Sequence, residues 1–344
     1  MFSSFFIYRL NDETTPHAGA ANECLEGLQP PGFVIGSFNN SENSRFTIPL
    51  TAGKMTAENL LDLIRNGKAD FTDTALYPFP AASTTATEHS HNVKLAKMAL
   101  KAHPEGKIVI ARTLLTHSET DIRCRLPELF EAINARYPEA NVFCFHTPQS
   151  STYIGATPEV LLSARNGRLQ SMALAGTRRR GILEPWDEKN IQEQAIVTQY
   201  ITETLAAHGL TPIAGETFTR PNGPIEHLCT PVEAFLPSDF TLQSLDSLLT
   251  DFSPTPALCG MPKKFAYDFI CSHENFSRGY YGGFWGFCTD ERNFHFMVNL
   301  RSARLRAHDI AYMAGGGITP LSDENEEWEE TEAKIATLRA IIER

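Results

Sequence analysis

The C-terminal part of the chain places a run of three glycines between an apolar stretch and an acidic one. Residues 310–314 are apolar and predict a β-strand, and the glycines at 315–317 let a ligand approach the backbone closely because they carry no Cβ. Ser322 can cap a helix over 323–342, whose first turns are rich in glutamate. This order predicts a strand, a turn that suits an anion, and an acidic helix.

One face of this helix carries the groups that could do chemistry. Glu327, Glu330 and Lys334 recur at helical spacing and share a face, while an apolar stripe is formed by Ile335, Leu338, Ile341 and Ile342. Such a face fits a site that combines a metal ion with carboxylates. Acids near a helix N-terminus also complement the helix dipole, so the pattern alone leaves both interpretations open.

The composition predicts a globular protein for which nucleic acid is not a main partner. The chain has 344 residues, of which 42% are hydrophobic, enough for an ample core. Its formal net charge of −11 opposes binding to phosphates, and its only dense basic run is residues 178–180. The sequence carries no indication of an oligomeric state.

Neither membrane insertion nor export is expected. Residues 1–10 are apolar but lack a basic n-region, and no segment approaches the roughly 18 consecutive apolar residues of a membrane-spanning helix. The seven cysteines are scattered without a C-x-x-C pair, which indicates neither a disulfide framework nor a zinc site. These features favour the cytoplasm.

Short β-like runs and amphipathic stretches alternate along the chain, which predicts an α+β fold with extensive antiparallel sheet. Strands are expected at 5–10, 33–38, 45–50, 107–115, 141–146 and 169–174, and in a closing meander at 282–287, 293–305 and 308–313. Helices are expected at 57–66, 90–102, 126–136, 191–207, 242–249, 262–272 and 323–342. Without a linker or repeat, a single domain is expected, with 73–90 as a mobile loop or helix entry.

Two residues could supply acid–base chemistry. Lys107 opens an apolar strand pattern over 107–112, and a lysine that acts as a base has to be neutral, a state that a nearby metal ion or cation favours. Glu159 follows a strand that ends at Pro158, and residues 160–162 are apolar. An apolar pocket raises the pKa of a carboxyl group, so Glu159 can serve as a general acid. Taken singly, a solvated lysine and a surface glutamate are the simpler interpretations.

Downstream residues could bind a carboxylate and a metal ion. The small residues at 173–177 would let backbone N–H groups line a pocket for a carboxylate. Glu193 forms an i, i+4 pair with Lys189, but facing a pocket it could hold Mg²⁺, which typically takes one or two protein carboxylates. Glu327 or Glu330 would supply the second.

Further polar side chains suit an anionic ligand. They are His227, Thr255, Tyr281 and Arg301, of which arginine offers a planar fork for a carboxylate and tyrosine a hydroxyl donor. The chain has no Walker A motif and no G-x-G-x-x-G after a strand, so nucleotide binding loses support.

Taken in order, these motifs resemble the chorismate-utilising enzyme family, to which the first component of anthranilate synthase belongs. The motifs are Lys107-Ile-Val-Ile-Ala-Arg112, Gly155-Ala-Thr-Pro-Glu159, Leu174-Ala-Gly-Thr177, Lys189-x3-Glu193, His227-Leu-x-Thr230, Pro254-Thr-Pro-Ala-x-x-Gly-x-Pro262, Gly315-Gly-Gly-Ile318 and Ser322-Asp-x3-Glu327-Trp-x-Glu330-Thr-x2-Lys334. The match is closest to isochorismate synthases of menaquinone or siderophore pathways. Residues 1–100 carry no diagnostic motif and are expected to be the N-terminal part of the same domain, before a chorismate-binding catalytic region at 101–344.

The resemblance implies a single domain in which large antiparallel sheets pack together centrally with helices outside. It also implies that Lys107 matches the base that activates water for attack at C2 of chorismate, and that Glu159 matches the acid that protonates the departing C4 hydroxyl. Glu193 and Glu330 match the Mg²⁺ carboxylates, with Glu327 acting through water, and the metal would hold the ring carboxylate of the substrate. The residues that match pocket positions and take substrate carboxylates are Gly176, Thr177, His227, Thr255, Tyr281, Arg301, Gly316 and Lys334.

The expected reaction is therefore the isomerisation of chorismate to isochorismate. Ala175 stands where aminodeoxychorismate synthases carry a lysine nucleophile, and Lys107 stands where anthranilate synthases carry a non-basic residue. Salicylate synthases share the equivalents of Lys107 and Glu159 and also eliminate pyruvate, so they remain the alternative. A catalytically silent member acting as a binding subunit is a further alternative, against which the retention of both residues argues.

The sequence also departs from the family pattern near the expected metal site. Gln194 follows Glu193 where the family usually has histidine, and Asn190 stands where it usually has an acid. The segment between Gly181 and Lys189 is shorter than usual, which indicates a trimmed loop.

Overall fold

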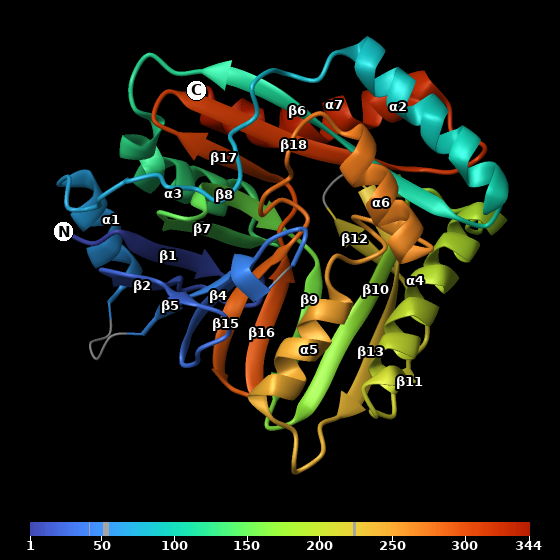
Figure 1. Cartoon of the computed structure of the whole chain (residues 1–344), viewed down its shortest axis with the longest axis horizontal. Coiled ribbons are helices and arrows are strands. Elements are labelled where there is room, and N and C mark those ends of the chain that lie inside the picture. The colour runs from blue at the N-terminus through green and yellow to red at the C-terminus, as the bar shows by residue number, and fades with distance from the viewer. Residues whose placement is uncertain (41, 51–54, 223–224) are drawn as a thin grey trace.

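Two large antiparallel sheets form the centre of the molecule, and helices cover their outer faces (Figure 1). The computed structural model describes residues 1–40, 42–50, 55–222 and 225–344. The eight-stranded sheet has the spatial order β14 (Gly260–Met261), β6 (Lys107–His117), β18 (Asp309–Ile318), β17 (Ser302–Arg306), β8 (Ser151–Thr157), β7 (Asn141–Thr147), β1 (Ser4–Arg9) and β2 (His17–Ala21).

The ten-stranded sheet contains the remaining strands of the described residues. Its order is β11 (Ile213–Ala214), β13 (Ile225–Phe235), β10 (Arg168–Arg179), β9 (Val160–Arg165), β16 (Asn293–Val298), β15 (Phe284–Asp290), β4 (Gly32–Gly36), β5 (Arg45–Pro49) and β3 (Leu25–Glu26), with β12 (Phe218–Asn222) paired to β13. The helices are α1 (Ala57–Arg65), α2 (Ala86–Ala99), α3 (Leu126–Arg136), α4 (Glu188–Ala207), α5 (Leu242–Phe252), α6 (Lys263–His273) and α7 (Glu324–Ile342). The predicted α+β fold with large packed antiparallel sheets is confirmed.

Strand β1 shows how the sequence builds a sheet that is covered on both faces. Successive side chains of a strand point to opposite faces, and all six residues of β1 are buried. Phe5 and Ile7 join a cluster with α1, α3 and α7 outside the sheet, whereas Phe6 and Tyr8 pack between the sheets. There Phe6 stacks on Phe33 of β4, with ring centroids 4.5 Å apart. The central core is therefore aromatic and draws on both sheets.

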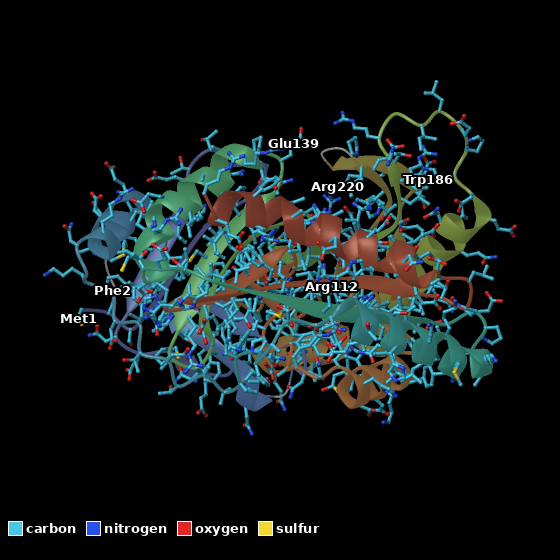
Figure 2. The ribbon with its side chains drawn as sticks, turned by 90° about the horizontal axis from the view of Figure 1, so that it is seen from above. Met1, Phe2, Arg112, Glu139, Trp186 and Arg220 are labelled. Carbon is cyan, nitrogen blue, oxygen red and sulfur yellow. The ribbon has the colours of Figure 1, made fainter. Side chains whose placement is uncertain are left out.

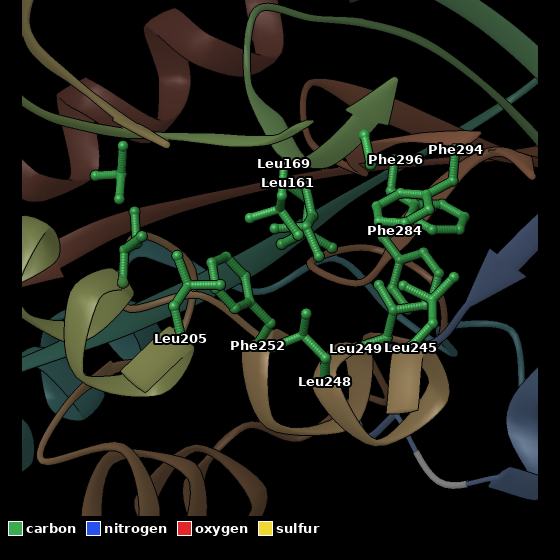
Figure 3. Packing of buried hydrophobic residues seen from close by; sticks show 14 of the residues in the cluster. Leu161, Leu169, Leu205, Leu245, Leu248, Leu249, Phe252, Phe284, Phe294 and Phe296 are labelled. Atoms are coloured by element: carbon green, nitrogen blue, oxygen red, sulfur yellow. The ribbon is translucent and has the colours of Figure 1, made fainter. Parts of the chain in front are cut away.

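The outer face of the ten-stranded sheet is covered by α4 and α5 (Figure 3). Leu245, Leu248 and Leu249 of α5 lie at helical spacing and are fully buried against the sheet, where Phe284 and Phe296 meet them. Thr241 begins α5 with a capping box that includes Ser244. This packing holds α4 beside β10 and β13 (Figure 1), which matters for the site below.

The N-terminal hundred residues contribute strands to both sheets. β1 pairs with β7 in one sheet, and β4 pairs with β15 in the other. These pairings join segments that are far apart in the sequence, so the N-terminal strands are integral to both sheets.

Among the described residues, no helix combines the length and apolar character needed to cross a membrane.

Two differences from the expected elements stand out. The strand expected at 293–305 is two strands, β16 and β17, which belong to different sheets because the chain crosses from one to the other at residues 299–301. The helix expected at 90–102 begins earlier, at Ala86, because Thr85 and Glu88 form a capping box. Residues 73–90 were expected to form a mobile loop or the entry to a helix. The last part of this segment is helical, in line with the second possibility.

Candidate active site

A cavity of about 190 Å³ lies where the ends of the two sheets meet α4 and α7. Its lining includes Lys107 of β6, Gly176 and Thr177 of β10, His227 of β13, Glu193 of α4, Glu330 and Lys334 of α7, and Glu159, Tyr281 and Arg301 from three loops. All of these were predicted from the sequence. Thr255, Gly316 and Glu327, which were also predicted, do not line this cavity.

The glycine run lies inside strand β18. The sequence had indicated a turn at this position. Gly315, Gly316 and Gly317 pair with Ala111, Ile110 and Val109 of β6. The turn follows at residues 319–321, and Asp323, not Ser322, caps α7 by accepting from the N–H groups of residues 325 and 326 at 2.9 and 3.2 Å.

The glycines are explained by what lies against them. A Cβ at Gly317 would overlap Cε of Lys107, and a Cβ at Gly316 would lie 2.5 Å from Oε2 of Glu327. Side chains alternate along a strand, so these two neighbours approach from opposite faces. Gly317 therefore makes room for Lys107 in the cavity, and Gly316 makes room for a buried glutamate on the other face.

Both lysines of the cavity are paired with the carboxylates that were predicted to bind metal. Nζ of Lys107 donates to Oε1 of Glu193 on α4. Nζ of Lys334 lies 2.6 Å from Oε1 of Glu330 and donates to the carbonyl of Gly315 at 2.7 Å. The partner of Glu193 is thus a residue far away in sequence, and the side chain of Lys189, its predicted partner, lies outside the part that the structure describes.

Glu159 is the buried acid of the site. Its residue is 7% exposed, and burial raises its pKa to about 7, although the charges of Lys107 and Arg301 oppose the rise. Its backbone carbonyl accepts from the N–H of Val298 at 3.0 Å, which fixes the turn after β8 against β16. A carboxyl group in this position carries its proton at neutral pH in a substantial fraction of molecules.

Arg301 reaches the cavity from the crossover between the two sheets. Its φ of 48° is in the left-handed region, which non-glycine residues rarely adopt. Its carbonyl accepts from the N–H of Ala156 at 3.2 Å, so the strained residue is held by β8. The positive φ lies where the chain leaves one sheet for the other, and Leu300 beside it also lines the cavity.

His227 is a neutral side chain in this site. Burial lowers its pKa to about 4, and the charges of Arg301 and Lys334 contribute to the decrease. Its Nδ1 lies 3.0 Å from the carbonyl oxygen of Gly176, which can only accept, so Nδ1 carries the hydrogen and Nε2 is an acceptor. His227 can thus accept a hydrogen bond from a hydroxyl group, and the basic side chains that line the cavity beside it are Lys107, Arg301 and Lys334.

The carboxylates fit a magnesium site of the kind that relies on few protein ligands. Glu193 and Glu330 line one cavity from different helices and offer the oxygen donors that Mg²⁺ prefers. Among the residues that the structure describes, no three His, Cys, Asp or Glu side chains cluster as a ready metal site. The donor set therefore matches a metal held by one or two carboxylates, with water and substrate oxygens as its other ligands.

Two predicted residues that do not line the cavity, Thr255 and Glu327, are buried next to its wall. Thr255 is 8% exposed, and its carbonyl accepts from the N–H groups of Leu258 and Cys259 at 3.0 and 2.8 Å. This turn brings Ala257 and Leu258 into the cavity wall. Glu327 is 8% exposed and packs against Gly316.

Helix α7 is fixed over the sheet by Arg112 of β6, which lies beneath it in the view from above (Figure 2). The Arg112 guanidinium lies 4.0 Å from the ring centre of Trp328, and its Nε donates to Oγ1 of Thr331 at 2.7 Å. Glu332 pairs with the same guanidinium. Arg112 is the last residue of the motif that begins with Lys107. This motif thus places Lys107 in the cavity and also anchors the helix that carries Glu330.

The apolar walls of the cavity and two of its polar supports were not predicted from the sequence. The walls include Leu174, Ile225 and Met313, which as single apolar residues carry no signal beyond that of a core. Asn190 and Gln194 bond to the backbone of β10, as described below, and their only signal was their departure from the family pattern.

Comparisons with known proteins point to one family. Residues 56–343 match the family described as chorismate binding enzyme. The isochorismate synthase EntC of Escherichia coli is 34% identical over 256 residues, which cover 70% of this chain and 63% of that protein. The chain thus spans less than two thirds of the length of that relative. The vibriobactin-specific isochorismate synthase of Vibrio cholerae is 28% identical over 356 residues, which cover 95% of this chain and 85% of that protein.

A solved structure shows the same fold. The menaquinone-specific isochorismate synthase MenF of Escherichia coli superimposes with a TM-score of 0.78 at 20% identity, covering 98% of this chain and 88% of that one. The family match extends over most of the chain and includes every residue that lines the cavity. The chain therefore belongs to the chorismate-binding enzyme family.

Proposed function

We propose that the protein is a Mg²⁺-dependent isochorismate synthase, which interconverts chorismate and isochorismate reversibly. The observation that carries the proposal is that Lys107 and Glu159 line one cavity, with a pKa of about 7 for Glu159. A base and a protonated acid are the two groups that an exchange of hydroxyl groups requires. The names of the relatives in Escherichia coli and Vibrio cholerae support the same reaction.

The proposed reaction moves one water molecule in and one out. Lys107, which must be neutral for this step, takes a proton from water as the water oxygen bonds to C2 of chorismate, and the ring double bonds shift. Its partner Glu193 would then be engaged by Mg²⁺ instead. Glu159 gives its proton to the C4 hydroxyl, which leaves as water. In the reverse direction the two residues exchange roles, so the reaction is expected to run from either side.

The charges of the cavity suit a substrate with two carboxylates. The protein carries a net charge of −11, which opposes the approach of a dianion, but Arg301 and Lys334 line the cavity. Mg²⁺ held by Glu193 and Glu330 would supply a Lewis acid for the ring carboxylate. His227, as a neutral acceptor, is placed to receive a hydrogen bond from a hydroxyl group of the substrate.

The test of this proposal is the product formed from chorismate by purified protein with Mg²⁺. We expect a mixture of chorismate and isochorismate of the same composition from either compound, without stoichiometric pyruvate. Pyruvate released at the rate of chorismate loss, together with salicylate fluorescence, would instead assign a salicylate synthase. No turnover at all would assign a catalytically silent member. We propose that the isochorismate made by this protein is used for the biosynthesis of menaquinone or of a siderophore.

Removal of the metal is expected to abolish turnover, and Glu330→Gln is expected to raise the Mg²⁺ concentration for half-maximal activity at least tenfold. Even partners outside the first coordination sphere typically contribute about 10–100-fold to metal affinity, and Glu330 is proposed as a direct ligand. Titration of activity with Mg²⁺ measures this. Glu329→Gln is the matched control, because it removes the same charge from an exposed neighbour on α7. Full activity in excess chelator would contradict the proposal.

A further inference from the structure

The part of β10 that lines the active site lacks a neighbouring strand on one edge. β10 pairs with β13 along residues 168–179, but within the described chain it pairs with β9 only over 168–170. Beyond that point the free edge meets α4, the helix that carries Glu193. Backbone groups of a strand need hydrogen-bond partners when they are buried, so the edge must be satisfied by something other than a strand.

Gln194 of α4 supplies what a neighbouring peptide group would. Its Oε1 accepts from the N–H of Ala175 at 2.8 Å, and its Nε2 donates to the carbonyl of Ala173 at 2.9 Å. Nε2 also donates to Oγ1 of Thr230 on β13 at 2.8 Å. The residue is 3% exposed. A carboxamide carries one acceptor and two donors, and here all of them are used in the dry interior.

Asn190 continues the same pattern one helical turn earlier. Its Oδ1 accepts from the N–H of Thr177 at 3.0 Å, and its Nδ2 donates to both oxygens of Asp187 at 2.9 Å. Between the two anchored N–H groups lies a β-bulge, where Gly176 has no partner in the β10–β13 register. Gly176 has a φ of 69°, and a Cβ there would lie 3.1 Å from Oδ1 of Asn190.

We propose that Asn190 and Gln194 are positioning residues that hold the bulge of β10 in the shape that receives the substrate. The inference rests on the proposed function, because the bulge presents Gly176 and Thr177 to the cavity. The N–H groups of Ala175 and Thr177 are engaged by α4, so they are not the donors that the small-residue motif had indicated. The carbonyl of Gly176 accepts from His227, so what the bulge presents to a ligand is the N–H of Gly176 and the hydroxyl of Thr177, which itself lies 3.1 Å from Nδ1 of His227.

The geometry also explains why a carboxamide stands at position 190. The side chain must accept from Thr177 and donate to Asp187, which a carboxylate cannot do because it only accepts. A carboxylate at 190 would in addition face the carboxylate of Asp187. The amide at 190 and the acid at 187 are thus a matched pair, and exchanging them conserves the charge, an acceptor for the N–H of Thr177 and one amide-to-carboxylate hydrogen bond between the two positions. Asn and Asp are equally good residues for the N-cap at 187.

The exchange of these two residues provides the test, with Asn190 chosen because it is less buried than Gln194. We expect Asn190→Ala to raise the KM for chorismate by about two- to tenfold, the range that the loss of one hydrogen bond predicts, with kcat changed less than KM. Asn190→Asp is expected to do the same or more. The double variant Asn190→Asp with Asp187→Asn is expected to return KM close to the wild-type value.

A readout without turnover separates this inference from the proposed function. Amide hydrogen exchange of the peptide that spans 173–178 should become faster in Asn190→Ala and return towards wild type in the double variant. Gln199→Ala is the control, since Gln199 lies on the same helix and, among the described residues, its amide bonds to Glu203, at 2.7 Å, and not to β10. Unchanged exchange and KM in Asn190→Ala would overturn the inference, as would a loss in kcat alone that the double variant does not restore. If wild type itself fails to turn over chorismate, the proposed function fails, and the exchange data still decide the role of Asn190.

Discussion

Replacement of Lys107 by alanine is expected to lower kcat by about 10²- to 10⁴-fold, the usual contribution of a general base. The change removes the group that would take the proton from water, while β6 keeps its pairing with β18 because alanine is compatible with a strand. Glu193 loses its ion-pair partner and becomes more available to a metal. The affinities for Mg²⁺ and chorismate should therefore not fall in parallel with kcat.

The measurement is turnover together with the thermal stability of the purified variant. Lys264→Ala is the control, because its side chain is 88% exposed and, within the part of the chain that the structure describes, pairs with Asp268 on the same helix. It removes the same charge without touching the cavity. If Lys107→Ala kept more than half of the wild-type kcat, Lys107 would not be the base.

Replacement of Glu159 by glutamine is expected to lower kcat by a similar factor, because an amide cannot give a proton to the departing hydroxyl. Wild-type kcat/KM should fall as pH rises through about 7, since the acid must be protonated and its pKa is raised to that value by burial. The residual activity of the variant should lack this decline. A wild-type profile that is flat between pH 6 and pH 8 would contradict the assignment.

Glu159→Gln is expected to lower activity but not stability. The pKa of Glu159 is higher in the fold than the ordinary value of 4.5, so ionisation disfavours the native state progressively between those two pKa values and fully above the upper one. Glutamine removes this cost. The thermal stability of Glu159→Gln at pH 8 is therefore expected to equal or exceed that of wild type, and thermal unfolding shows whether lost activity reflects misfolding.

How far the sequence predicted the fold can be seen at the C-terminal segment. The residues that reach the cavity from α7, Glu330 and Lys334, followed from helical spacing, which is a local property. The place of the glycines did not, because their pairing with β6 depends on a strand about two hundred positions earlier. A glycine run indicates a turn unless one knows that Lys107 and Glu327 occupy the space beside it.

The crossover at Arg301 shows a second limit of the same kind. Residues 293–305 alternate well enough for one long strand, and nothing local marks a change of sheet. The break follows from packing, since β16 pairs with β9 and β17 pairs with β8. The ion pair of Lys107 with Glu193 was missed for the same reason, since only the packing of α4 against the sheets brings these residues together.

The roles that were assigned by motif remain predictions, whereas the placement of most of the residues in one cavity is now a property of the structure. A motif match assigns a residue to a function without saying which backbone supports it. Asn190 and Gln194 illustrate this, because in the sequence they are only departures from the family pattern near the expected metal site, whereas in the fold they bond to β10.

The central claim, that water attacks C2 while the C4 hydroxyl leaves, is tested most directly by running the reaction in H₂¹⁸O with Mg²⁺ and analysing the product by mass spectrometry. We predict that isochorismate formed early in the reaction carries one ¹⁸O, located in its C2 hydroxyl, and that Lys107→Ala forms it far more slowly. Isochorismate without label would show that the hydroxyl migrates within the substrate, and it would contradict the roles proposed for Lys107 and Glu159.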